Sequence, residues 1–390
     1  MARHVTTLPA THLRADKRNI RGDDKLMITH FIPSRTSFIL PALVWLAACA
    51  SERTPTETEP PDDSVEASGW QVLPAAPLSP ALSRHADLFF LNPDLAWLVN
   101  TRGEVFRTGD GGESWTRIHN QPNTLYRAVG FASETKGWVG NLNNFNAPTP
   151  LNALFETLDG GATWSNITAR ITGTTPVGIC GIYVLDAETV FAVGRWNGPA
   201  AFVRSLDGGA TWEGVDLATL VTGIVDVYFF DRDTGIIVGG RGVGNSSAAQ
   251  DSSHTVILMT RDGGDTWQQK YVSTQRGKWA WKISFPSRQV GYVSTQGPTL
   301  DGIVLKTVDG GENWTELAAA PGYGFSGIGF ISELVGWVAS DTTAYATTNG
   351  GVGWQRVRIG TSVNRFRILS PTLGFAAGDG VYRYKPASNP

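Results

Sequence analysis

Thr157-Leu158-Asp159-Gly160-Gly161-Ala162-Thr163-Trp164 is one of six copies of a single motif, Thr/Ser-x-Asp/Asn-Gly-Gly-x-x-Trp, which we call the box. The six copies occupy residues 108–115, 157–164, 205–212, 260–267, 307–314 and 347–354. Their tryptophans lie 49, 48, 55, 47 and 40 residues apart, which is the interval of one four-stranded propeller blade. The repeat therefore predicts an all-β protein built as a β-propeller.

Each box has the chemistry of a hairpin turn. The Asp or Asn side chain can accept hydrogen bonds from backbone amides just ahead of it, and glycine adopts a positive φ without penalty. The tryptophan can bury a large apolar surface between neighbouring sheets while its indole N–H finds a partner. We therefore assign structural roles to the box residues Asp110, Asp159, Asp207, Asp262, Asp309, Asn349, Trp115, Trp164, Trp212, Trp267, Trp314 and Trp354.

The repeated acids could also be considered as cation ligands. Asn349 replaces the acid in the sixth box, and this change keeps the hydrogen bonds but removes the charge that a cation site needs. We predict no metal and no cofactor, and we expect the boxes to lie on the face away from the usual ligand side of a propeller.

The number of blades follows from the strands around the boxes. A second signature, an apolar strand and then Gly followed by an aromatic or branched residue, occurs for example at residues 129–139 and 328–338. After the sixth box, residues 366–368, 373–377 and 381–384 predict three strands of a seventh unit that has no box. Trp70 stands where the missing outer strand would begin. We predict a seven-bladed ring whose last blade is closed by this N-terminal strand, which leaves no open edge at the seam.

The N-terminal region has the composition of a targeting segment. Residues 38–46 are an apolar stretch after Arg35, too short for a mature membrane span but typical of a signal-peptide core. It ends in Leu46-Ala47-Ala48-Cys49, which resembles a bacterial lipobox, and we predict lipidation of Cys49. The predicted organisation is an upstream mis-start or disordered segment (1–26), a lipoprotein signal peptide (27–48), a disordered tether (49–68), the propeller (69–385) and a tail (386–390).

Composition limits the function classes. The 390 residues are 41% hydrophobic and 17% charged, with a formal net charge of −3, which does not favour nucleic acid. Cys49 and Cys180 are the only cysteines in the sequence. With Cys49 lipidated, no second cysteine remains to form a disulfide with Cys180, and we predict a buried structural thiol on an inner strand.

The six boxes, with the Gly-Trp-Val elements at 137–139 and 336–338, make residues 69–384 resemble Asp-box (bacterial neuraminidase repeat) propellers. Within that group the chain most resembles the photosystem II stability and assembly factor family. This resemblance implies a single seven-bladed ring that is not an enzyme and that holds a membrane-protein partner on an arginine-bearing face. Arg127, Arg195, Arg241 and Arg365 would be the counterparts of those arginines.

A protein-binding face is also indicated by the loops that should share one side of the ring. They carry arginines and aromatic residues, a combination enriched at binding hot spots. The predicted partner-binding residues are Arg84, Arg102, Arg127, Arg195, Trp196, Arg241, Lys278, Trp279, Tyr323 and Arg365. The alternative for each is that isolated arginines are solvated and that Trp279 and Trp281 pack between blades.

Two functions remain open. We predict a monomeric propeller, lipid-anchored to the outer rather than the inner membrane, that scaffolds an envelope or membrane protein without catalysis. The alternative is an extracellular glycan-binding propeller or a glycoside hydrolase similar to sialidases or xyloglucanases, with Asp226 and Glu104 as a conceivable carboxylate pair. The Arg-Ile-Pro element that sialidases carry ahead of the first blade is absent near Trp70, and Arg367-Ile368-Leu369 lies in a different blade.

Overall fold

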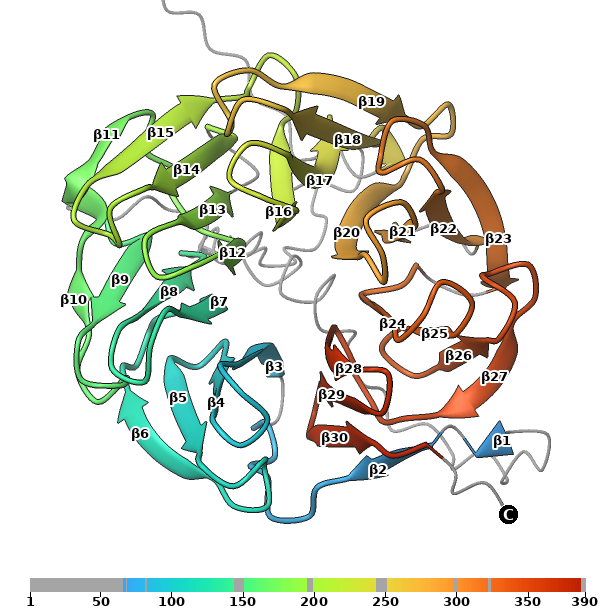
Figure 1. Ribbon diagram of the computed structural model, residues 1–390, viewed down its shortest axis with the longest axis horizontal. Coiled ribbons are helices and arrows are strands. Elements are labelled where there is room, and N and C mark those ends of the chain that lie inside the picture. Colours follow the sequence, from blue (N-terminus) through green and yellow to red (C-terminus); the bar gives the residue numbers. More distant parts are fainter. Residues whose placement is uncertain are drawn as a thin grey trace, which may run out of the picture. The chain divides into compact units, whose positions relative to one another are not determined.

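The computed structural model describes residues 66–67, 69–80, 83–143, 151–194, 199–242, 251–297, 301–321 and 324–386. These residues form seven sheets, each built on four antiparallel strands, arranged as the blades of a ring (Figure 1). The predicted seven-bladed β-propeller is therefore confirmed. Residues 144–150 and 243–250, which belong to the insertions 141–153 and 241–254 of the sequence, and the predicted signal peptide lie outside the described residues.

The blades follow one another along the chain, and the first strand of each lies nearest the centre of the ring (Figure 1). Blade 1 is β3 (His85–Phe90), β4 (Ala96–Asn100), β5 (Glu104–Thr108) and β6 (Thr116–Asn120), and blade 2 is β7 (Tyr126–Phe131), β8 (Gly137–Asn141), β9 (Leu154–Thr157) and β10 (Ser165–Asn166). Blade 3 is β12 (Gly181–Val184), β13 (Val190–Gly194), β14 (Ala201–Ser205) and β15 (Trp212–Asp216), and blade 4 is β16 (Gly223–Phe229), β17 (Gly235–Arg241), β18 (His254–Thr260) and β19 (Gln268–Val272).

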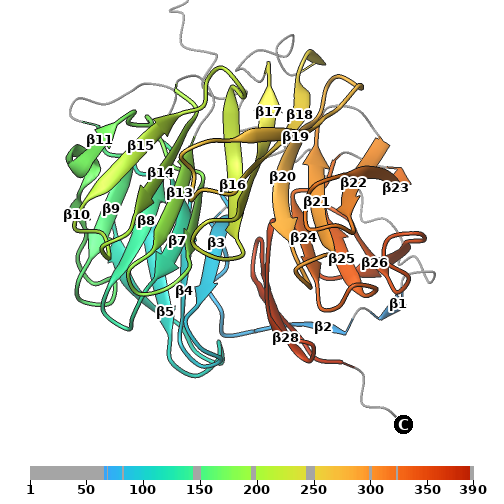
Figure 2. The same cartoon turned by 45° about the horizontal axis from the view of Figure 1, so that its top comes forward.

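The second half of the ring repeats this order. Blade 5 is β20 (Trp279–Ser284), β21 (Gly291–Gln296), β22 (Asp301–Thr307) and β23 (Thr315–Pro321), and blade 6 is β24 (Gly327–Phe330), β25 (Gly336–Ala339), β26 (Ala344–Thr347) and β27 (Gln355–Arg358). Blade 7 is β28 (Arg365–Ser370), β29 (Leu373–Ala377) and β30 (Val381–Tyr384), completed by β2 (Trp70–Val72). In Figure 2, β16, β17 and β20 run from one face of the ring to the other.

The seam closes as the sequence predicts. β2 pairs antiparallel with β30, with Trp70 opposite Tyr384 and Val72 opposite Tyr382. Trp70 is 8% exposed, and its ring lies 5.3 Å from the rings of both Trp337 and Phe366. The N-terminal strand is therefore an integral layer of the last blade.

Two short strands extend blades beyond the four predicted strands. β1 (Glu66–Ala67) pairs in parallel with β27 of blade 6, and β11 (Ile171–Gly173) pairs in parallel with β15 of blade 3. β11 follows a single 3-10 turn, Thr168–Arg170. β1 falls within the predicted tether 49–68, so pairing with the ring begins three residues before the expected boundary.

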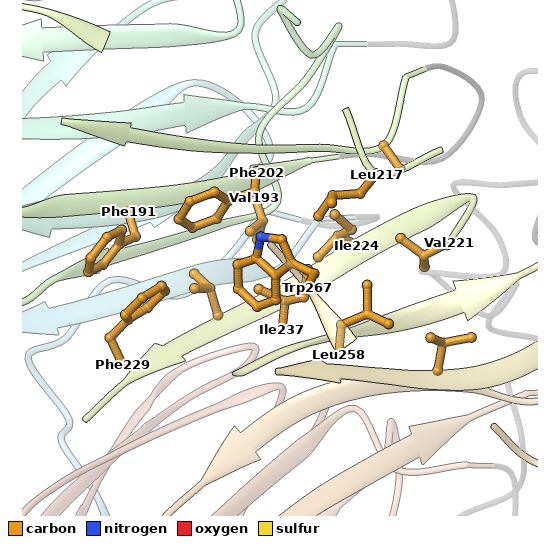
Figure 3. Packing of buried hydrophobic residues seen from close by; sticks show 13 residues of the cluster. Phe191, Val193, Phe202, Leu217, Val221, Ile224, Phe229, Ile237, Leu258 and Trp267 are labelled. Carbon is orange, nitrogen blue, oxygen red and sulfur yellow. The ribbon is translucent and has the colours of Figure 1, made fainter. Parts of the chain in front are cut away.

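The hydrophobic core is divided among the blade interfaces. Seven clusters of buried side chains occur, and each draws residues from two neighbouring blades. Between blades 3 and 4, the Phe191 and Phe229 rings stack at 3.6 Å, and the box residue Trp267 lies 5.0 Å from Phe202 (Figure 3). The predicted role of the box tryptophans as packing between sheets is confirmed at this interface.

The boxes fold as hairpin turns. In the first box Asp110 Oδ1 accepts hydrogen bonds from Thr108 Oγ1 at 2.7 Å and from the Ser114 amide at 2.9 Å. Gly111 and Gly112 have φ of 68° and 87°, a region that favours glycine. The Trp115 indole donates to the Gly112 carbonyl at 3.1 Å. The same pattern of bonds recurs in the other five boxes, including Asn349 in the sixth.

The boxes share one face with the turns between the first and second strands of each blade. The amide of the first box glycine donates to a carbonyl in that turn, as Gly111 does to Asp94 and Gly350 does to Leu334. We call the face that carries the boxes the lower face. The opposite side, which carries the connections between blades and between second and third strands, is the upper face.

Candidate functional site

Charged side chains meet at the axis of the ring. The seven innermost strands carry two carboxylates, Asp87 and Asp226, and four cations, Arg127, Lys282, Arg365 and Arg367. These six residues come from blades 1, 2, 4, 5 and 7. We call them the channel cluster.

Arg365 of blade 7 joins the two carboxylates. Its Nε lies 2.6 Å from Asp87 Oδ1, and its Nη1 lies 3.2 Å from Asp226 Oδ2. All three side chains are at most 6% exposed. A buried ion pair is favourable only when further hydrogen bonds satisfy its atoms, and here backbone amides supply them: Val129 donates to Asp87 and Ile283 donates to Asp226.

The electrostatic balance keeps both carboxylates ionised. Burial on its own would raise the pKa of Asp87, but Arg365 and Arg367 overcome it and hold the pKa below its usual value. Asp226 behaves in the same way, with Arg365 and Lys282 as the main opposing charges. Neither carboxyl group can supply a proton near neutral pH.

Lys282 is the least satisfied member of the channel cluster. Its side chain is 1% exposed, its Nζ lies 3.8 Å from Asp226 Oδ1, and this nitrogen makes no hydrogen bond within the described part of the chain. Burial, and then the positive charge of Arg365, lower its pKa well below the ordinary value.

Arg127 occupies the axis between blade 2 and blade 5. Its Nη1 donates to the Ala86 carbonyl at 2.9 Å, and its guanidinium lies 5.3 Å from the centre of the Trp281 ring. Such a cation–π contact is favourable in a desolvated setting. The inner strands bulge at this level: the pairing register shifts at Tyr126/Ala128 in blade 2 and at Ala280/Lys282 in blade 5.

The predicted partner-binding residues divide into three groups. Arg102 and Arg241 are exposed and lie on the upper face. Arg84, Arg127, Lys278, Trp279 and Arg365 are at most 6% exposed. Arg195, Trp196 and Tyr323 lie outside the described residues.

Burial of the second group has a structural reason. The sequence predicted that residues 126–127, 278–282 and 364–367 lie in the loops of one face, but these segments include the first residues of inner strands β7, β20 and β28. Arg127 and Arg365 therefore point into the ring axis, where they join the channel cluster, and do not project as exposed side chains from the upper face. Trp279 and Trp281 are buried, as expected from the alternative in which they pack between blades.

The carboxylates considered for sugar chemistry are not assembled as a pair. Asp226, on the innermost strand of blade 4, is ionised and paired with Arg365. Glu104 lies on the third strand of blade 1, where it accepts hydrogen bonds from Asn100 and Arg117, each at 2.7 Å. Burial opposes ionisation of Glu104, and those two partners nonetheless keep its pKa below the usual value.

One member of the channel cluster, Asp87, was not among the predicted residues, and two others, Lys282 and Arg367, were expected in loops and not at the axis. Their signal was present, because each is a charged residue on a largely apolar inner strand, where a charge must be paired. Cys180 is buried, as predicted. Among the residues that the structure describes, no group of His, Cys, Asp and Glu is placed to hold a metal ion, and no apolar helix reaches the length of a bilayer span.

Comparisons with known proteins support the fold. No family model matches the chain, and no curated protein matches it. Among solved structures, it is similar to YCF48 from Cyanidioschyzon merolae, with 20% identity, a TM-score of 0.61, and coverage of 82% of this chain and 99% of that one. It is also similar to a YCF48 bound to a D1 peptide, with 18% identity, a TM-score of 0.59, and coverage of 84% and 99%. An ancestral GH74 enzyme matches at 14% identity and a TM-score of 0.55, over 81% of this chain and 45% of that one.

Proposed function

We propose that this chain is a non-catalytic propeller that binds a protein partner at the cell envelope, tethered to a membrane through lipid on Cys49. The observation that carries the proposal is the charge balance at the axis. Four cations surround two carboxylates, so the carboxylates are ion-paired and unsuited to acid–base catalysis, while the centre of the ring favours an anionic partner.

Two further points support this function. One similar structure is that of YCF48 bound to a D1 peptide, so a ring of this architecture accommodates a peptide ligand. Arg102 and Arg241 are exposed on the upper face, where the connections between blades gather. Exposed arginines are common anchors of protein interfaces.

A GH74 enzyme shares the architecture, and glycoside hydrolysis is the competing function. That reaction needs two carboxyl groups on either side of the scissile bond, one of them protonated. The ion-paired Asp226 and the hydrogen-bonded Glu104 do not provide this arrangement. We therefore propose binding in preference to hydrolysis.

The test compares wild type with an Arg102→Glu/Arg241→Glu variant in crosslinked capture from membranes, followed by identification of the captured proteins. Both side chains are exposed, so the variant should fold, which circular dichroism and thermal unfolding would check. Arg232→Glu is the matched control, because Arg232 is an exposed arginine paired with Asp186 and Glu188 on the lower face.

We expect one envelope protein to be captured by wild type and by the Arg232 control and to be lost from the double variant. Capture that is indifferent to the upper-face charges would contradict binding through this face. Hydrolysis of a glycan by the purified wild type would contradict the non-catalytic function.

A further inference from the structure

A cavity of about 360 Å³ lies at the lower end of the ring axis, on the side opposite to the face proposed for the protein partner. Its lining comes from the innermost strands of blades 3 to 7 and from the turns that follow them, including Pro286 and Pro371. Those turns belong to the lower face. A cavity of this volume falls in the range of small-ligand pockets.

One wall of the cavity is aromatic. The rings of Tyr183 and Tyr228 lie 5.2 Å apart, and Tyr228 stacks on Phe285 at 5.1 Å. Burial raises the pKa of Tyr183 and of Tyr228, so both hydroxyls stay protonated and can donate hydrogen bonds. This wall suits a flat apolar group that also carries an acceptor.

The inner end of the cavity is cationic. Arg365, Arg367 and Asp226 all line it. Asp226 is already engaged by Arg365 and by the Ile283 amide. Arg367 donates through Nε to the Leu88 carbonyl at 2.5 Å and through Nη2 to Asp87 at 3.1 Å. Its side chain is 24% exposed, against 6% for Arg365 and 1% for Lys282, so Arg367 is the most accessible of these three cations.

The channel cluster holds more positive than negative charge in either state of Lys282. With Lys282 protonated, four cations face two carboxylates. With Lys282 neutral, three arginines still face two carboxylates. Arg365 and Arg367 also share one carboxylate oxygen, Asp87 Oδ1, at 2.6 Å and 3.1 Å, so an anion in the cavity would give Arg367 a counter-charge of its own.

We propose that this lower cavity is a binding site for an aromatic carboxylate, with the carboxylate at Arg367 and the ring against Tyr183 and Tyr228. The same chemistry is presented by a small aromatic acid and by a polypeptide that ends in an aromatic residue. A monocarboxylate fits better than a dianion because Arg367 already contacts Asp87 and because Asp226 also lines the cavity.

The experiment measures binding by ligand-observed NMR and calorimetry with matched probes. Phenylacetate is compared with phenylacetamide, which has the same shape and no charge. The peptide Gly-Ser-Gly-Ser-Phe is compared as free acid and as C-terminal amide. We expect each acid to bind at least about tenfold more tightly than its amide, since a charge-assisted hydrogen bond is roughly twice as strong as a neutral one.

Two variants locate the site. Arg367→Gln should weaken acid binding at least about tenfold, while the exposed lower-face control Arg232→Gln should leave it unchanged. Because Arg367 also pairs with Asp87, its variant could fail to fold. Ser370→Trp is then decisive, since it narrows the mouth of the cavity and leaves every charge in place, and it should abolish binding.

Several outcomes overturn the proposal: no probe binds, the amides bind as tightly as the acids, or folded Arg367→Gln or Ser370→Trp protein binds as wild type does. Tighter binding of the peptide acid than of phenylacetate identifies a polypeptide C terminus as the ligand, and equal binding identifies a small acid. The Arg102→Glu/Arg241→Glu variant should bind the probes normally, so failure of the upper-face function leaves this test intact.

Discussion

At the scale of single residues, the boxes show how a carboxylate can recur at the surface for a purely structural reason. The pKa of Asp207 falls to about 2 because the Thr211 hydroxyl and amide, followed by the Ser205 hydroxyl, donate to the carboxylate. In the sixth box Asn349 Oδ1 accepts equivalent bonds from Thr347 Oγ1 at 3.0 Å and from the Gly353 amide at 2.9 Å. The acceptor oxygen is the shared requirement, and the charge is secondary.

Removing this acceptor oxygen should therefore lower the free energy of unfolding more than removing only the charge of the side chain. We expect Asp207→Ala to lower the free energy of unfolding by about 1 to 2 kcal/mol through lost hydrogen bonds, and Asp207→Asn to lower it less. The folded pKa lies below the ordinary value of 3.8, so the charge-dependent part of the stability is present above that pH and is lost as the pH falls toward 2. Urea unfolding at several pH values would check this, and an equal loss in both variants would contradict it.

Lys282 gives the opposite prediction, because its charge is buried without a hydrogen bond. We expect Lys282→Met to raise the free energy of unfolding, since an apolar side chain of similar length removes the desolvation penalty. The folded pKa is lower than the ordinary 10.5, so the unfolded state binds more protons between those two values and the wild type gains stability as the pH rises through that window. The stability gained by Lys282→Met over the wild type should therefore shrink as the pH rises through that window.

Denaturant unfolding of both proteins from neutral pH to about pH 10 would measure the benefit of Lys282→Met. Ser294→Ala is a useful control on the same sheet, because its hydroxyl accepts from the Lys282 amide and carries no charge. A loss of stability at neutral pH would show that the Asp226 contact outweighs desolvation, and a benefit that is constant with pH would show that the buried charge of Lys282 is not its source.

At the scale of elements, a glycine and a phenylalanine explain the second signature of the repeat. A Cβ on Gly336, which opens the second strand of blade 6, would lie 2.4 Å from the ring of Phe330, which ends the first strand. Gly235 has the same relation to Phe229 at 2.5 Å in blade 4. The aromatic ring lies over the glycine, so the pair fixes the first hairpin of these blades.

We expect Gly336→Ala to lower the free energy of unfolding by about 1 to 3 kcal/mol, because the added methyl overpacks a buried ring. Gly109→Ala is the matched control: a Cβ there has no neighbour within 4 Å and the residue has no positive φ. Urea denaturation compares the two. Equal stability of both variants would mean that the Phe330 ring can move aside at little cost.

At the scale of the whole molecule, stability depends on closing the ring with a strand from the other end of the chain. Trp70 packs against blade 6 through Trp337 and against blade 7 through Phe366 and Tyr384. We expect Trp70→Ala to cost about 3 to 5 kcal/mol, whereas Gln71→Ala, an exposed position on the same strand, should cost little. Thermal unfolding would measure both, and small effects of both substitutions would show that the ring holds without the seam.

The sequence predicted the ring, the blade count and the closing strand because each blade repeats the same turn and Gly-aromatic pattern. It did not predict β1 or β11, since parallel pairing of two or three residues at a blade edge has no pattern of its own. The channel cluster was found only in part. Asp226 and Arg365 were noted separately, but the contact between them joins blades 4 and 7, and the charges of distant strands meet only when the ring closes.

The seam also determines how the molecule would respond to mechanical load. The amino end enters through β1, which lies along blade 6, and then through Gly69, whose carbonyl accepts from the Lys385 amide at 2.9 Å before β2 pairs with β30. Tension applied through the N-terminal segment would reach these few bonds before any other blade, and would peel the outermost strand of blade 7. When the protein is held by its N-terminal segment, the strand that closes the ring carries the load. Pulling the chain at residue 69 should therefore open blade 7 first. The force needed should be lower than the force that separates any two neighbouring blades when both are pulled directly.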